Sequence, residues 1–112
     1  MKLVTAIIQP SRLENVKAAL ERSGVHGMTV SDASGFGRQK GHPLDEQGPE
    51  HAPELLAKIR VEILVENVDA ERVVGAVVNA AQTGAIGDGK VWVVPVEDVA
   101  RVRTGERGSA AL

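Results

Sequence analysis

The residues from 57 to 66 place the strongest constraint on how this chain can fold. Apolar β-branched side chains occupy every second position there: Ile59, Val61, Ile63 and Val65. Mostly charged side chains fill the positions between them: Lys58, Arg60, Glu62, Leu64 and Glu66. Strict period-two alternation over this length predicts a β-strand with one apolar face and one polar face. The chain must therefore build a sheet around this segment.

Further strands are expected on both sides of it. Residues 2–9 are β-branched and mostly apolar on both faces, which is typical of a buried central strand. Residues 28–35 predict a second strand, and residues 91–94 predict a fourth. We also expect a short strand around 99–103 and a polar tail over 104–112.

Two amphipathic helices are expected between the strands. Residues 11–14 (Ser-Arg-Leu-Glu) read as a capping box, which predicts a helix over 12–23 that ends at Gly24. Asp69 is the expected N-cap of a second helix over 70–81, whose valines form an apolar stripe.

The resulting order is β-α-β, a long loop over 36–56, then β-α-β. This is the double split pattern of a ferredoxin-like α+β fold, with a four-stranded antiparallel sheet and both helices on one face. We expect one domain over residues 1–112. The other face of the sheet then needs a cover. Because the strand over 2–9 is apolar on both sides, we expect the chain to associate with copies of itself.

Composition excludes several classes of function. Aromatic residues make up 2% of the chain, which argues against a platform on which nucleic-acid bases stack. The formal net charge of −2 argues against a general polyanion binder. Absence of cysteine excludes disulfides and thiolate metal sites. With no apolar run of membrane-spanning length and no signal-peptide pattern, we expect a cytoplasmic protein without direct membrane insertion.

Two glycine-rich segments with cations indicate an anion-bearing ligand. Residues 35–42 hold three glycines and two cations, and Lys90 follows Gly87-Asp88-Gly89. Glycine-rich backbone beside positive charge suits phosphate. Arg101 and Arg103 would point the same way on an extended segment. The alternative is that these are solvated surface charges and that Asp-Gly marks a simple turn.

Three of these stretches together resemble the PII nitrogen-regulatory signalling family: residues 35–42 (Gly-Phe-Gly-Arg-Gln-Lys-Gly-His), 82–90 (Gln-Thr-Gly-Ala-Ile-Gly-Asp-Gly-Lys) and 101–106 (Arg-Val-Arg-Thr-Gly-Glu). Residues 6–10 and 27–30 are similar to it as well. The match runs along the whole chain.

The resemblance implies a homotrimer of ferredoxin-like subunits that binds ATP or ADP in the clefts between subunits. Residues 37–55 would be the effector loop, or T-loop, which contacts a target protein. The nucleotide-binding positions it implies are Thr29, Gly37, Arg38, Glu62, Leu64, Gly87, Asp88, Gly89, Lys90, Arg101 and Arg103.

The resemblance also implies a 2-oxoglutarate site beside the nucleotide. Gln39 would help to hold Mg²⁺ with ATP, and Lys58 would bind a carboxylate of the 2-oxoacid. The backbone at Gly37, Lys40 and Gly41 would complete that site. The chain would then be a regulator of nitrogen metabolism and not an enzyme.

The effector loop departs from the family pattern. His51 stands where many members carry a tyrosine that receives a nucleotidyl group, and the chain has no tyrosine at all. Pro49 stands where some members carry a phosphorylated serine. We therefore expect control by small molecules alone. The target is left open between an ammonium transporter, another transporter and a metabolic enzyme.

Other hypotheses are weighed against this one. The chain could be a specialised PII paralogue that reads adenylates or an anion such as bicarbonate, and controls a transporter or a carbon-metabolism partner. A slow ATPase is disfavoured because no nucleophile-and-base pair is evident. His42 and His51, with the carboxylates near them, could suggest a metal site, but their irregular spacing favours a solvated loop.

Overall fold

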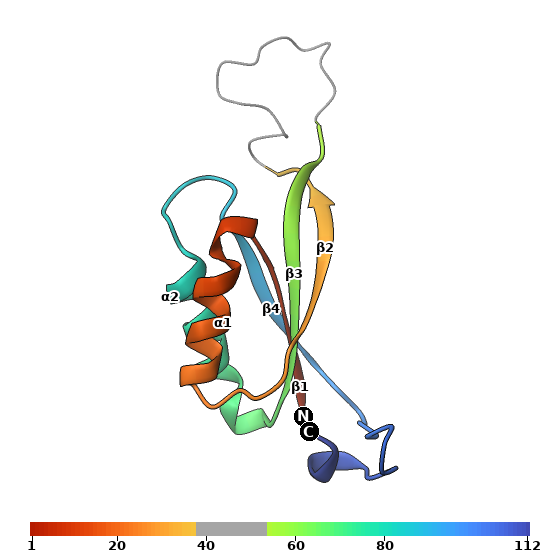
Figure 1. Cartoon of the computed structure of the whole chain (residues 1–112). Helices are drawn as coiled ribbons and strands as arrows, with labels where there is room; N and C mark the ends of the chain where they lie inside the picture. The colour runs from red at the N-terminus through yellow and green to blue at the C-terminus, as the bar shows by residue number, and fades with distance from the viewer. Residues whose placement is uncertain (38–53) are drawn as a thin grey trace.

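The computed structural model describes residues 1–37 and 54–112. Figure 1 shows four strands and two helices, namely β1 (Lys2–Ile8), α1 (Leu13–Arg22), β2 (Thr29–Gly35), β3 (Leu56–Val65), α2 (Ala70–Ala81) and β4 (Gly89–Pro95). Short 3₁₀ helices precede α1 and α2 at Pro10–Arg12 and Asn67–Asp69, and a third spans Gly108–Ala111.

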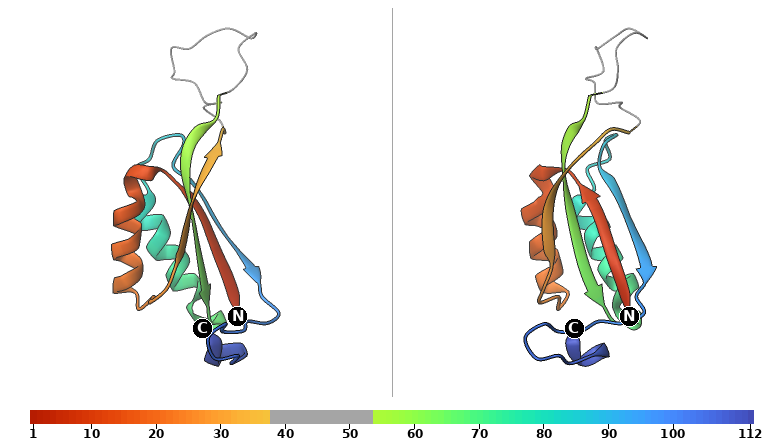
Figure 2. Two further views of the ribbon diagram at one scale, coloured as in Figure 1. Left: turned by 45° about the vertical axis from the view of Figure 1, so that its right-hand side comes forward. Right: turned by 90° about the vertical axis from the view of Figure 1, so that its right-hand side faces the viewer.

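The four strands form one antiparallel sheet in the order β2-β3-β1-β4. Both helices cover the same face of this sheet (Figure 2). The predicted double split β-α-β fold is therefore confirmed, and β1 is the central strand that its two apolar faces indicated. Among the described residues, none of the helices is long and apolar enough to cross a membrane.

The core lies between the sheet and the helices. The predicted alternation in β3 holds, because Ile59, Val61, Ile63 and Val65 are all buried. The rest of the core comes from β1 and from the inner sides of the helices: Val4, Ala6, Ile8, Val16, Leu20, Ala70, Val73, Val77 and Ala81. Burial of this apolar surface is the main stabilising contribution to the fold.

The expected helix caps are wrong in detail. Helix α1 begins at Leu13, after the 3₁₀ turn, and within the described residues no side chain caps its first turn, so the capping box at Ser11 does not form. Asp69 does precede α2, but its Oδ1 accepts a hydrogen bond from Arg72 Nη1 at 2.7 Å instead of from a helix N–H. Gly24 ends α1 as expected, with a φ of 87° that favours glycine.

Two arginines instead bind carbonyls at the C-terminal ends of the opposite helices. Arg12, before α1, donates from Nε and Nη2 to the carbonyl oxygen of Ala80 near the end of α2, at 3.1 and 2.7 Å. Arg72, near the start of α2, donates from Nε and Nη2 to the carbonyl of Ser23 after α1, at 3.2 and 3.0 Å. Each guanidinium therefore satisfies a free carbonyl and complements the negative end of a helix dipole.

We expect Arg12→Ala to lower the free energy of unfolding by about 1–2 kcal/mol, because it removes two charge-assisted hydrogen bonds from a half-buried position. Urea denaturation measures this. The control is Arg22→Ala, at an exposed position, where the change should stay within about 0.5 kcal/mol. Equal effects of the two substitutions would show that the bond to Ala80 does not stabilise the fold.

The end of the chain differs from expectation. No strand forms over 99–103; the chain turns at 102–104, and a single bridge pairs Ala100 with Arg107. The cause is the backbone at Gly105, whose φ is 76° and whose N–H donates to the carbonyl of Arg101 at 2.7 Å. The expected polar tail instead folds back as a 3₁₀ helix, and the two termini lie close together (Figure 1).

Candidate functional site

Lys58 is the most unusual residue at the end of the sheet from which the long loop leaves. Its exposed fraction is 8%, although it lies on the face of β3 that the helices do not cover. Its Nζ donates to the carbonyl oxygen of Gly87 at 3.0 Å and to Oε1 of Gln9 at 3.4 Å. Within residues 1–37 and 54–112, no carboxylate forms an ion pair with it. A buried ammonium with neutral partners is costly, and such groups mark candidate anion sites.

The loop between α2 and β4 is organised by the carboxylate of Asp88. Its Oδ2 accepts hydrogen bonds from the backbone N–H groups of Thr83 and Gly84, at 2.7 and 2.9 Å. Its Oδ1 accepts from the Thr83 hydroxyl. The hydroxyl and then the backbone N–H of Thr83 hold the pKa of Asp88 below its ordinary value. This contribution to loop order is therefore present above the ordinary carboxyl pKa and lost as pH falls through the folded-state pKa.

Gly89 lies in direct contact with the central strand. It pairs with Ile8, has a φ of 101°, and a Cβ atom built on it would lie 1.7 Å from the carbonyl oxygen of Ile7. Only glycine fits this position. The neighbouring Lys90 pairs with Ile7 and so lies on the open face of the sheet. The pairing of β4 with β1 therefore fixes where Lys90 and the loop before it lie along the sheet.

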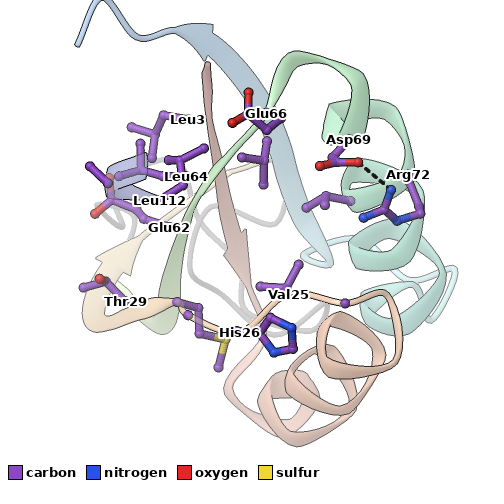
Figure 3. Close-up of a pocket in the computed structure, with 16 residues that line it drawn as sticks. Leu3, Val25, His26, Thr29, Glu62, Leu64, Glu66, Asp69, Arg72 and Leu112 are labelled. Atoms are coloured by element: carbon purple, nitrogen blue, oxygen red, sulfur yellow. Dashed lines mark hydrogen bonds and ion pairs between the residues drawn. The ribbon is translucent and has the colours of Figure 1, made fainter. Parts of the chain in front are cut away.

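A separate group of predicted residues gathers near the far end of the sheet. Thr29 pairs with Glu62 in the β2–β3 register, and Leu64 follows on the same face of β3. All three line a cleft of about 780 Å³ (Figure 3). Leu112 lies beside Leu64 and Glu62 in that view and lines the same cleft. The cleft therefore offers an apolar wall next to a carboxylate and a hydroxyl.

The C-terminal segment carries two of the predicted arginines, and Arg101 is bonded to this end of the sheet through Leu112. Arg101 donates from Nη1 to Oε1 of Glu106 at 3.2 Å and from Nη2 to the carbonyl oxygen of Leu112 at 3.1 Å. Arg103 is exposed and lies in the turn. The expectation that the two side chains point the same way rested on an extended segment, and the segment is not extended. Arg101 is nevertheless linked to the cleft through Leu112.

Within one chain, the predicted residues around Lys58 and Gly89 lie far from those that line the cleft. Gly89 pairs with Ile8 and Leu64 pairs with Leu3, five residues apart on β1, which corresponds to roughly 17 Å along the strand. Gly37, near the start of the long loop, is the last residue described before position 54. The remaining predicted positions Arg38, Gln39, Lys40 and Gly41 lie outside the described residues, as do His42 and His51. Among the residues that are described, no group of three His, Asp or Glu side chains could hold a metal ion.

A family model described as "Nitrogen regulatory protein P-II" matches residues 1–106. The chain belongs to the P-II family. The resemblance seen in the three glycine-rich and arginine motifs is therefore confirmed. As a member of this family, the chain is a nitrogen-regulatory signal transducer.

Relatives and a solved structure agree with this. The chain is 50% identical to a nitrogen regulatory protein P-II of Rhizobium meliloti and 48% identical to one of Azospirillum brasilense, over all of both chains. A crystal structure of Arabidopsis thaliana PII bound to citrate matches with a TM-score of 0.82 at 41% identity. That match covers 99% of this chain and 91% of the plant protein.

Three contacting residues escaped the sequence analysis. Gln9 accepts from Lys58, Thr83 donates to Asp88, and Glu106 accepts from Arg101. Thr83 and Glu106 lie inside the motifs that carried the family resemblance, so their positions were in view but their contacts were not. Gln9 gave no signal, because its contact depends on the pairing of β1 with β3.

Proposed function

We propose that this P-II protein is a homotrimer that binds ATP or ADP in clefts between subunits, and 2-oxoglutarate together with Mg-ATP. Through residues 37–55 it would regulate target proteins of nitrogen metabolism without nucleotidylylation of a tyrosine. The observation that carries the proposal is Lys58. A buried ammonium bound to the carbonyl of the Gly87 loop is well placed to receive a carboxylate next to a phosphate-binding loop.

The separation of the two residue groups supports binding between subunits. Gly87, Gly89 and Lys90 suit phosphate, whereas Thr29, Glu62 and Leu64 suit a base, and these groups lie at opposite ends of one sheet. A contact that joins the first end of one subunit to the second end of the next is heterologous, and repeated heterologous contacts form a ring when the rotation between subunits closes. A closed trimer would thus complete three sites at once.

The uncovered face of the sheet supports the same assembly. Its rows carry large apolar side chains, several of them half-exposed or exposed: Leu3, Ile7, Leu64, Trp92 and Val94. Although charged residues share this face, large exposed apolar side chains gathered on one surface typically mark a contact with another protein surface. In a trimer the three faces would cover one another.

Binding of the two ligands would be coupled. 2-Oxoglutarate is a dianion that chelates Mg²⁺, and ATP supplies phosphate oxygens to the same ion. Gln39, which we propose as a further ligand of Mg²⁺, lies outside the described residues. Reciprocity then requires each ligand to tighten the binding of the other by the same factor. The signal would be a shift in the populations of the 37–55 loop.

Calorimetric titration of ATP and Mg²⁺, with and without 2-oxoglutarate, tests the proposal. We expect micromolar binding of ATP, corresponding to about −8 kcal/mol, that becomes at least several-fold tighter with 2-oxoglutarate. ATP binding that is indifferent to 2-oxoglutarate would contradict the 2-oxoglutarate site and favour a paralogue that reads adenylates or another anion. Absence of ATP binding would overturn the proposal as a whole.

A further inference from the structure

We infer that Asp88 is a positioning residue, which holds the 83–88 loop in the shape that presents Gly87, Gly89 and Lys90 to the phosphates, and does not itself touch the nucleotide. The inference rests on the proposed nucleotide site and assigns Asp88 a different role in it. The loop connects α2 to β4 and lies at the same end of the sheet as the root of the long loop (Figure 1).

The direction of the carboxylate carries the inference. Both of its oxygens accept hydrogen bonds from the beginning of the loop: two from the N–H groups of Thr83 and Gly84, and one from the Thr83 hydroxyl. The Thr83 oxygen in turn accepts from the N–H of Ala85 at 3.2 Å. All of these donors belong to the loop itself, so the Asp88 carboxylate links the end of the loop to its beginning.

The backbone of the loop explains why such a closure is needed. Gly84, Gly87 and Gly89 have φ values of 88°, 104° and 101°, in the left-handed region. Glycine reaches this region freely but also has the most conformational freedom to lose, so a glycine-rich loop has no fixed shape without added contacts. The Asp88 carboxylate supplies those contacts at the start of the loop, and Lys58 supplies one at the carbonyl of Gly87.

The negative charge of Asp88 also supports its role as a positioning residue. Asp88 stands between the two glycines whose N–H groups would bind phosphate, where a free carboxylate would repel the ligand. Three donors directed at the carboxylate stabilise its negative charge within the loop, and they also hold its pKa below the ordinary value. Both of its oxygens are thus occupied by donors of the loop, so its charge shapes the loop and is not directed at Mg²⁺ or at the phosphates.

The test compares ATP with adenosine in calorimetric titrations of the full chain. Asp88→Ala should weaken ATP binding by about 10-fold or more, because a charged acceptor with several donors is lost. Thr83→Val should weaken it by about 3- to 10-fold, and Thr83→Ser, which keeps the hydroxyl, should recover most of that loss. Affinity for adenosine, which lacks phosphates, should stay within about 2-fold in all three variants, whereas general damage to the fold would weaken both ligands.

Three results would overturn the inference. Asp88→Ala with unchanged or tighter ATP binding would show that the loop keeps its shape without the carboxylate. A loss in Asp88→Ala that appears only with Mg²⁺ and is not shared by Thr83→Val would make Asp88 a metal ligand. Equal losses for ATP and adenosine would make its role one of general stability. If the parent protein binds no ATP, the proposed function fails instead, and the inference fails with it.

Discussion

Gly89→Ala is expected to lower the free energy of unfolding by about 3 kcal/mol or more and to abolish nucleotide binding. Two costs add at this position. Alanine at a φ of 101° is strained by about 1–2 kcal/mol, and its Cβ would lie 1.7 Å from the carbonyl oxygen of Ile7. Relief of that overlap requires β4 to move away from β1, which typically costs a further 1–3 kcal/mol. The movement would also displace Lys90 and the 83–88 loop, which we propose to bind the phosphates.

Gly84→Ala is the matched control. Its φ of 88° is almost the same, but a Cβ atom there would meet nothing within 4 Å, and its N–H would still reach Asp88. We expect about 1 kcal/mol of destabilisation and retained ATP binding. Urea denaturation and calorimetry of both variants separate backbone strain from steric overlap. If the two variants lose the same stability, the close approach of Gly89 to β1 is not what requires glycine there.

The fold could be predicted from the sequence because its main signals are periodic and local. The alternation at Ile59, Val61, Ile63 and Val65 fixed both the strand and its buried side. The doubly apolar strand over 2–9 indicated the central position that β1 takes. Gly24 marked the end of α1. Each of these depends on which residues lie next to one another in sequence.

The failures come from competing contacts that the sequence patterns do not rank. The cap expected at Ser11 did not form because the chain enters α1 through a 3₁₀ turn, and Asp69 pairs with Arg72 three residues on. The strand expected over 99–103 was replaced by a turn that Gly105 allows. The bonds of Arg12 and Arg72 to carbonyls 68 and 49 residues away are long-range, and no local pattern reports such contacts.

The candidate site was likewise predicted in part and missed in part. Resemblance assigned Lys58 to a carboxylate of the 2-oxoacid and Gly87, Asp88 and Gly89 to the nucleotide, but it did not distinguish the tasks of these last three. The structure separates a buried cation, a carboxylate turned into its own loop, and a glycine pressed against β1. These differences arise from burial and from cross-strand register, which a motif does not contain.

Lys58→Met is expected to weaken 2-oxoglutarate binding by about 10- to 100-fold while ATP affinity without 2-oxoglutarate changes by less than about 3-fold. Methionine keeps the apolar length of the side chain and removes the ammonium, so the proposed charge-assisted bond to the ligand carboxylate is lost. Calorimetric titration of 2-oxoglutarate in the presence of Mg-ATP measures the first effect, and titration of ATP alone measures the second.

The stability of Lys58→Met should not fall along with its affinity for 2-oxoglutarate. Within the described residues the ammonium of Lys58 has neutral partners, namely Gln9 and the carbonyl of Gly87, and a buried charge of that kind stabilises the fold little or costs free energy. We therefore expect the free energy of unfolding of Lys58→Met to stay within about 1 kcal/mol of the parent or to rise. A large loss of stability would show that Lys58 serves the fold and would remove the main support for the anion site.

Arg60→Met is the control for charge on the same strand. Arg60 lies two residues along β3 on the same face, but its side chain is 43% exposed and pairs with Glu62 at 3.5 Å. Its charge already has a carboxylate partner and contact with water, so its loss should change 2-oxoglutarate affinity by less than about 3-fold. If Arg60→Met weakens 2-oxoglutarate as much as Lys58→Met does, the ligand responds to the general positive potential of this face. If only Lys58→Met does, the buried position of the ammonium is what makes the site.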